Sequence, residues 1–173
     1  MTANKTERVL QGSIVLLLLL LAGAIFDAMR DKVVGVGDRA PNFSITTDSG
    51  RQVSRSEFGG RLLVLNFWAT WCPPCVEEMP SLDEFQRRLA SSGVVVLGVS
   101  VDTDERAYRE FLRKAKVSFL TARDPAAAIS AEYGTFKFPE TYVIDARGRV
   151  VQKHIGPAIW TDENLVRSIQ SLL

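Results

Sequence analysis

Hydrophobic residues form one uninterrupted block near the start of the chain. Residues 9–26 read VLQGSIVLLLLLLAGAIF and carry no charge, with Lys5 and Arg8 before them and Asp27 after them. Such a run, at about 1.5 Å per residue, is just long enough to cross the apolar layer of a membrane as a helix. Basic residues before a span favour a cytoplasmic location for that end. We therefore expect a cytoplasmic N-terminus over residues 1–8 and a transmembrane anchor over residues 9–26.

Two other interpretations of this block stay open. The positive start and the small-x-small sequence Ala22-Gly23-Ala24 are also typical of a cleaved signal peptide. A buried core helix is less favoured, because the block is apolar on every face and lies at the terminus. Anchor and signal peptide lead to one expectation for the rest: residues 27–36 form a linker, and residues 37–173 form a domain on the extracytoplasmic side of the cell membrane.

Two further apolar runs predict the centre of that domain. Residues 62–68 and 94–101 are almost continuously hydrophobic, which is typical of strands covered on both faces. Between them, apolar residues spaced by three or four predict an amphipathic helix over residues 76–89, which Pro80 bends rather than ends. A strand-helix-strand order implies parallel pairing through a right-handed crossover.

Shorter patterns predict the remainder of an α/β domain. Alternating residues predict a small hairpin over residues 43–53 and another over residues 141–155 with its turn at residues 145–148. Asp124 and Thr161 are predicted to be the N-caps of two helices. The remaining predicted elements are a helix over residues 104–116, a strand over residues 117–121, a helix over residues 125–133 and a final helix after Thr161.

Charge narrows the range of partners. The 173 residues include 21 basic and 20 acidic side chains, which gives a formal net charge of +1. These charges are spread along the chain, so the sequence has no basic footprint for a phosphate polymer. We expect no nucleic-acid partner and no bound cofactor.

The chain has two cysteines, and both lie where the first buried strand gives way to the predicted helix. Unpaired N–H groups and the positive end of the helix dipole stabilise a thiolate at such a position. Cys72 is therefore the predicted nucleophile. Cys75, one turn later, is placed to resolve a mixed disulfide formed at Cys72. Pro73 and Pro74 suit the helix start and stiffen the ring that the two sulfurs close.

A metal site or a purely structural bridge is the alternative use of this pair. A closed zinc site needs four nitrogen or sulfur ligands, whereas the chain offers two thiols and the single His154. A bridge between residues this close in sequence removes little loop entropy and stabilises little. Redox chemistry, with Cys72 and Cys75 as a redox-active disulfide, is the stronger prediction.

The segment from Asn66 to Cys75, NFWATWCPPC, resembles the active-site segment of thioredoxin-like proteins, and most of all the extracytoplasmic TlpA/ResA/CcmG (DsbE) branch. The resemblance covers about residues 37–173. It implies a thioredoxin-like fold, a central mixed sheet flanked by helices, with an N-terminal hairpin, a helical insertion after the second strand and one membrane anchor. It also implies a thiol-disulfide oxidoreductase that reduces disulfides in exported proteins such as apocytochrome c, recharged by a membrane electron donor of the CcdA/DsbD type.

The same resemblance assigns the substrate-binding residues. Phe138-Pro139-Glu140-Thr141 matches the loop in which a cis-proline faces the cysteines. We therefore expect a cis peptide bond at Pro139. The resemblance implies a substrate groove lined by Trp71, Pro73, Pro74, Phe138 and Pro139.

Two glutamates are further candidates. Glu78 matches an acidic residue that the ResA group places near its active site, and Glu140 matches the family's Pro-Glu-Thr variant. Either could add negative charge at the thiols or relay a proton, but Glu78 could also be an ordinary solvated helix carboxylate. Asn66 stands where cytosolic thioredoxin has a buried aspartate, which suggests that proton handling has moved to Glu78 or Glu140.

Two related families share parts of the pattern. Copper chaperones of the Sco type are anchored thioredoxin folds, but three residues separate their cysteines, whereas two separate Cys72 and Cys75 here. Peroxiredoxins have a similar opening to residues 37–43, but Ala69 stands where that family has a threonine three residues before its reactive cysteine. A copper-binding chaperone for respiratory oxidase assembly stays the alternative function, with His154 as its candidate ligand.

Overall fold

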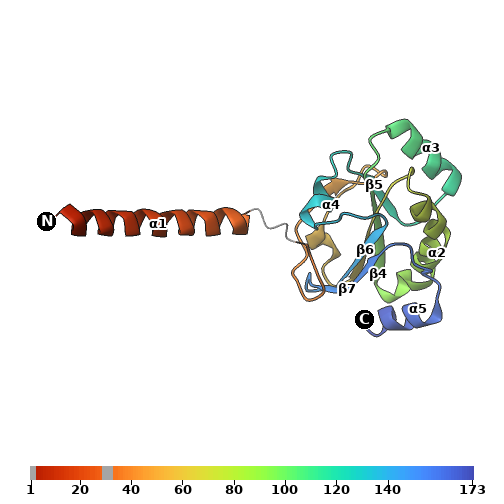
Figure 1. Cartoon of the computed structure of the whole chain (residues 1–173). Helices are drawn as coiled ribbons and strands as arrows, with labels where there is room; N and C mark the ends of the chain where they lie inside the picture. The colour runs from red at the N-terminus through yellow and green to blue at the C-terminus, as the bar shows by residue number, and fades with distance from the viewer. Residues whose placement is uncertain (1–2, 29–32) are drawn as a thin grey trace. The chain divides into compact units, whose positions relative to one another are not determined.

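The computed structural model describes residues 3–28 and 33–173, and the chain divides into two compact units, Met1–Lys32 and Val33–Leu173. The first unit contains helix α1 (Ala3–Ala28), drawn in red in Figure 1. Its side chains are exposed from Glu7 to Ala24, the stretch that is long and apolar enough to cross a membrane. The buried-core interpretation of this block is therefore wrong. Residues 1–2 of the predicted N-terminus and 29–32 of the predicted linker lie outside the described residues.

The second unit is built on a five-stranded mixed sheet. The strands run in the order β5-β4-β3-β6-β7. β3 and β4 are parallel, as are β4 and β5, whereas β6 is antiparallel to β3 and β7 is antiparallel to β6. Their bounds are β3 (Leu62–Trp68), β4 (Val94–Ser100), β5 (Leu120–Arg123), β6 (Glu140–Ile144) and β7 (Val150–Ile155). The predicted central mixed sheet is confirmed.

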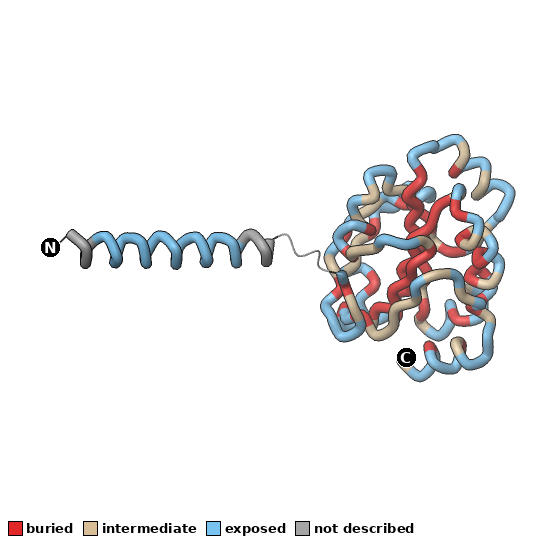
Figure 2. The backbone as a smooth tube through the Cα atoms, viewed as in Figure 1, coloured by how far each residue is buried: buried red, intermediate tan, exposed pale blue. Residues whose placement is uncertain are grey.

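Both faces of this sheet are covered, which explains the continuous apolar run of β3. Leu62, Val64 and Trp68 belong to a core shared with α2 (Pro73–Leu89), α3 (Glu105–Ala115) and α5 (Glu163–Gln170). Leu63, Leu65 and Phe67 belong to a second core, on the side of α4 (Ala128–Glu132) and the segment before β3. Figure 1 shows α4 and α2 on opposite sides of the sheet, and Figure 2 shows the buried strands between them.

N-terminal segments lie along both edges of the sheet. The hairpin β1 (Ser44–Thr46) and β2 (Gln52–Ser54) is followed by the short helix η1 (Arg55–Phe58). Thr47 bridges Ala122 in edge strand β5, and the N–H of Asp48 donates to Thr121 at 2.9 Å. At the other edge, the N–H of Gly37 donates to Val150 at 2.8 Å, where β7 begins.

Three sequence-based boundaries are wrong. Asp124 does not open a helix over residues 125–133, because Ala127 has a left-handed φ of 52°, which cannot continue a right-handed helix. The Asp124 carboxylate instead accepts from the N–H of Ile129, inside the shorter α4. The last helix is capped by Asp162 rather than Thr161. The strand predicted over residues 117–121 is β5, shifted towards the C-terminus by its pairing with β4.

The helix whose apolar pattern covers residues 76–89 starts at the two prolines, as predicted. α2 begins at Pro73, immediately after Cys72, so both prolines lie in its first turn. Pro80 lies inside α2, and the helix continues beyond it to Leu89, as predicted. A short 3-10 helix, η2 (Ala90–Ser92), leads from there into β4.

Candidate active site

Cys72 and Cys75 form a disulfide at the N-terminus of α2, with their Cα atoms 5.3 Å apart. Cys72 is the N-cap residue, and its carbonyl oxygen accepts from the N–H groups of Cys75 and Val76. The exposed fraction is 7% for Cys72 and 0% for Cys75. Of the two residues, only Cys72 has any surface open to solvent. Pro73 and Pro74 have no N–H groups, so negative charge at Cys72 is favoured by the positive end of the α2 dipole rather than by unpaired N–H groups.

Asp102, at the end of β4, fixes the loop that presents Cys72. Its carboxylate accepts from the N–H of Thr70 at 2.9 Å and from the hydroxyl of Thr70 at 2.6 Å. The hydroxyl of Ser100 donates to the same carboxylate at 2.5 Å, and Asp102 is buried. Asp102 was not among the site residues predicted from the sequence. Its position just after a buried strand was an available signal, because the carboxyl ends of parallel strands β3 and β4 share one edge.

The peptide bond between Phe138 and Pro139 is cis, as predicted. The ring of Phe138 meets that of Trp71 edge-on, with centroids 6.0 Å apart. This contact joins the loop before β6 to the segment that contains the disulfide. Trp71 is 63% exposed, an unusual position for a large aromatic side chain. An apolar surface thus lies beside Cys72.

Glu78 lies in α2 and is buried, so it is not a solvated helix carboxylate. One oxygen accepts from the side-chain amide of Asn66 at 2.8 Å. The other accepts from the N–H of Ala158 at 3.1 Å and the indole of Trp160 at 3.3 Å. Burial raises the pKa of Glu78, although these hydrogen bonds partly offset the rise. The group therefore holds its proton more tightly than an exposed glutamate.

Asn66 connects Glu78 to the strand that follows the cis-proline. Its side-chain amide donates to the hydroxyl of Thr141 at 2.9 Å as well as to Glu78. Its side-chain oxygen is buried and has no hydrogen-bond partner among the described residues. The cluster of Asn66, Glu78 and Thr141 therefore includes one buried acceptor without a donor among the described residues.

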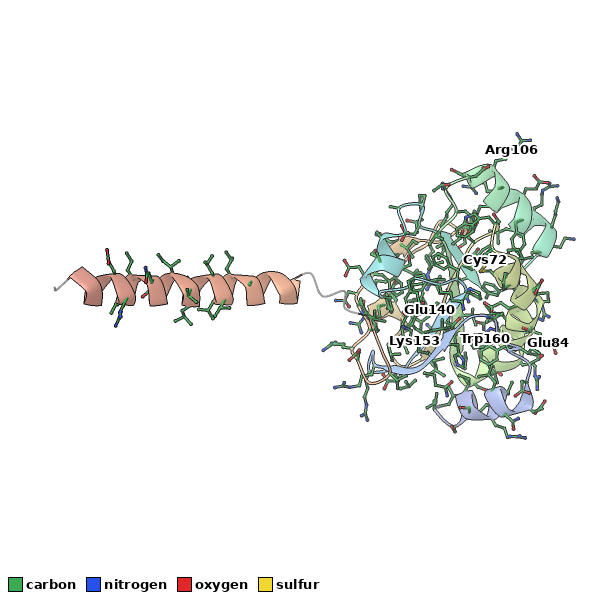
Figure 3. The ribbon with its side chains drawn as sticks, viewed as in Figure 1. Cys72, Glu84, Arg106, Glu140, Lys153 and Trp160 are labelled. Atoms are coloured by element: carbon green, nitrogen blue, oxygen red, sulfur yellow. A yellow bond between two sulfur atoms is a disulfide. The ribbon has the colours of Figure 1, made fainter. Side chains whose placement is uncertain are left out.

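Glu140 is also fully buried, in a separate cluster. One of its oxygens accepts from the hydroxyl of Tyr142 at 2.6 Å and forms an ion pair with Lys153 at 2.8 Å. Burial and this carboxylate raise the pKa of Tyr142, so its hydroxyl stays protonated and donates. Figure 3 shows Glu140 beside Lys153. The two glutamates share no hydrogen bond, but Thr141 lies between their clusters, next to Glu140 in sequence and bonded to Asn66.

Trp160, Tyr142 and Lys153 were not predicted as site residues. Trp160 lies 82 residues from Glu78 in the sequence. Tyr142 lies two residues after Glu140 on the same strand, β6, whereas Lys153 reaches Glu140 from the neighbouring strand β7. Lys153 is paired with Tyr142 in the β6–β7 ladder. A lysine in a strand with alternating pattern was the available signal, but only the strand register places it next to Glu140.

No group of three metal-binding side chains occurs within residues 3–28 and 33–173. His154, the candidate copper ligand, packs against the ring of Trp160 with centroids 5.4 Å apart, and one ring nitrogen lies 3.3 Å from Gln152. Burial lowers its pKa. These contacts give no specific support to the copper-chaperone alternative.

Comparison with known proteins agrees with this geometry. The Redoxin family matches residues 35–169. The thiol-disulfide oxidoreductase ResA of Bacillus cereus is 33% identical over 165 residues, covering 91% of this chain and 94% of that protein. The thioredoxin-like protein YneN of Bacillus subtilis is 34% identical over 149 residues, covering 82% of this chain and 87% of that protein.

Solved structures show the same architecture. The crystal structure of a DsbE thiol:disulfide interchange protein from Chlorobium tepidum superimposes with a TM-score of 0.75 and 29% identity, covering 80% of this chain and 98% of that one. A cysteine pair bonded at the start of a helix and these relatives lead to one conclusion. The chain belongs to the Redoxin family and is a thiol-disulfide oxidoreductase of the ResA and DsbE type.

Proposed function

We propose that this oxidoreductase is held in the cell membrane by α1, with its domain on the extracytoplasmic side, and reduces disulfides in exported proteins. The exposed apolar surface of α1 from Glu7 to Ala24 supports the anchor. Lys5 and Arg8 support the orientation, because basic residues tend to stay on the cytoplasmic side. The foremost client we propose is apocytochrome c, whose haem-attachment cysteines must be reduced before ligation.

The main support for this proposal is the difference in exposure between Cys72 and Cys75. In the reduced protein, the thiolate of Cys72 attacks one sulfur of a client disulfide, and the client's other sulfur leaves and takes up a proton. Cys75 then loses its proton and attacks the sulfur of Cys72, which forms the internal disulfide and releases the second client thiol. Two electrons and two protons pass to the client, and the buried Cys75 is shielded from competing disulfides.

We propose that Glu78 and Glu140 serve the proton transfers. Glu78 lies three residues after Cys75 on α2, so both side chains are on one face of the helix. A carboxyl group whose pKa is raised by burial exchanges protons closer to neutral pH than an exposed one. Glu140 follows Pro139 directly and has one oxygen without a partner among the described residues.

The client groove is proposed to run between two aromatic side chains. Trp71 and Phe138 flank it, and Pro73, Pro74 and Pro139 complete its lining. The prolines lack N–H groups, so the client backbone meets mainly apolar surface around Cys72. A membrane electron donor of the CcdA/DsbD type would recharge the protein by the same exchange in reverse, at the same sulfur of Cys72.

Trapping tests the proposal. In cells that produce the full chain with Cys75→Ala, Cys72 should hold clients as mixed disulfides that reductant releases. The matched control, Cys72→Ala with Cys75→Ala, should hold none. Capture of apocytochrome c supports the client assignment. Capture of other exported proteins alone contradicts that assignment but keeps the reductase, and absence of any mixed disulfide contradicts the reductase.

Labelling tests the location. In intact cells, a membrane-impermeant maleimide should modify Cys72 of the Cys75→Ala variant if the domain is outside the cytoplasm. The mass of the membrane-bound protein should include residues 1–26 if α1 is an anchor rather than a cleaved signal peptide. Labelling that requires cell lysis would contradict the proposed orientation.

A further inference from the structure

The side chain of Lys153 is almost completely buried, which is uncommon for a lysine. Its side chain is 10% exposed and pairs with Glu140, whose side chain is 0% exposed. Every other ion pair among the described residues has at least one partner that is more than one-third exposed. Desolvating two charges costs several kcal/mol per ion and is tolerated only with close, well-made contacts. A pair that the fold maintains at this cost points to a specific role.

Two further contacts fix the ammonium of Lys153. It donates to the carbonyl oxygen of Val34 at 3.0 Å, and it lies 4.9 Å from the centre of the Tyr142 ring. A lysine normally extends its ammonium into water, and its flexible stem leaves that group mobile. Here a carboxylate, a carbonyl oxygen and an aromatic face hold it from three sides.

The pair uses only one oxygen of Glu140. The ammonium of Lys153 and the hydroxyl of Tyr142 both bind Oε1. Oε2 is buried and has no partner among the residues that the structure describes. Lys153 and Tyr142 therefore orient the carboxylate and leave its second oxygen free, one residue after the cis-proline.

We propose that Lys153 is a positioning residue for the exchange reaction, which fixes Glu140 with Oε1 held and Oε2 free beside the loop that receives the client. This inference rests on the proposed role of Glu140. Lys153 acts on the disulfide through Glu140 and not by direct contact. Without the ammonium of Lys153, the buried carboxylate of Glu140 has no counter-charge and its side chain is free to rotate. Both changes alter the electrostatic potential at the cysteines.

A double-mutant cycle tests this route. The full chain is purified in detergent, and the equilibrium constant between its Cys72–Cys75 disulfide and glutathione is measured for Lys153→Met, Glu140→Gln and the double variant. Lys153→Met should change that constant about three- to thirtyfold, as expected for coupled groups in contact. In the Glu140→Gln background the same substitution should change it by less than about twofold. Lys114→Met, which removes a lysine from an exposed pair with Glu110, should leave it unchanged.

If Lys153 had only a structural role, Lys153→Met would lower the free energy of unfolding, but its effect on the equilibrium constant would not depend on Glu140. An equal shift in both backgrounds, or none in either, would overturn the inference. If Lys153→Met does not fold, the double variant can still be compared with Glu140→Gln, because removing both charges of a buried pair is usually tolerated. A difference in the equilibrium constant between those two variants would overturn the route through Glu140. If the wild-type chain fails to exchange with glutathione, the proposed reductase fails, whatever Lys153 does.

Discussion

The side-chain amide of Asn66 lies 2.8 Å from the carboxylate of Glu78, and both groups are fully or almost fully buried. Asn66 belongs to β3 and Glu78 to α2, and the short loop between these two elements contains Cys72. A neutral amide in this position can hydrogen-bond the carboxylate without competing for its proton. The ionisation of Glu78 is therefore set mainly by burial, and it should be visible in both stability and reactivity.

Stability should depend on pH through Glu78. Its folded pKa is raised above the usual 4.5, so the unfolded chain releases this proton at lower pH than the folded chain. The free energy of unfolding should then fall as pH rises from the usual value through the raised one, and stay lower above it. Glu78→Gln should remove this part of the pH dependence in denaturant titrations of the oxidised protein. Glu84→Gln, on the exposed side of α2, should retain it.

Reactivity should change when both buried glutamates lose their charge. With Glu78→Gln and Glu140→Gln together, less negative charge opposes thiolate formation, so the thiolate fraction at neutral pH should rise. Thiolate absorbance at 240 nm across a pH series measures that fraction for the coupled set of groups. A titration curve unchanged from wild type would reject a role for either carboxylate in tuning the thiols.

The two thiols of the reduced protein should differ in accessibility. Cys72 is 7% exposed and Cys75 is 0% exposed, so iodoacetamide should modify Cys72 first. Peptide mass spectrometry after brief alkylation identifies the modified residue. Modification of Cys75 at the same rate would mean that Cys75 is not protected in the reduced state, contrary to the exchange order proposed above.

Asp102 should matter for the position of Cys72 although it does not touch either sulfur. Asp102→Ala removes the acceptor of two hydrogen bonds from Thr70 and one from Ser100. Leaving the buried hydroxyl of Ser100 and the half-buried donors of Thr70 unpaired should cost about 2–4 kcal/mol in the free energy of unfolding. Urea unfolding of the oxidised protein measures the loss. Asp104→Ala, which removes an exposed helix cap, should cost only about 1 kcal/mol.

The central features of the fold could be predicted because they leave local patterns. β3 is hydrophobic except at Asn66, since helices and N-terminal segments cover its two faces. The cysteine spacing, with prolines at the helix start, indicated the chemistry before any contact was known. The cis bond at Pro139 came from family resemblance, because no local pattern distinguishes it from a trans bond.

Other features depend on contacts that a linear pattern does not contain. Thr161 and Asp162 are both good helix caps, and Asp162 takes that role, with its carboxylate accepting from Asn164 and Leu165. The burial of Trp160 in the core beside Phe85 places the start of α5. Trp160 likewise reaches Glu78 from a distant segment, and Lys153 reaches Glu140 from the adjacent strand. The carboxylates could therefore be selected from the sequence, but these partners could not.

The N-terminal segments beside β5 and β7 have a consequence for how many copies can share a membrane. An uncovered edge strand offers unpaired N–H and C=O groups to any neighbouring sheet. Proteins anchored in one bilayer meet at high local concentration, which favours such edge-to-edge aggregation. Thr47 and Asp48 occupy part of one edge, and Gly37 occupies part of the other. With the proposed anchor, copies of the domain can therefore be crowded on a membrane while these parts of the two sheet edges are closed to other sheets.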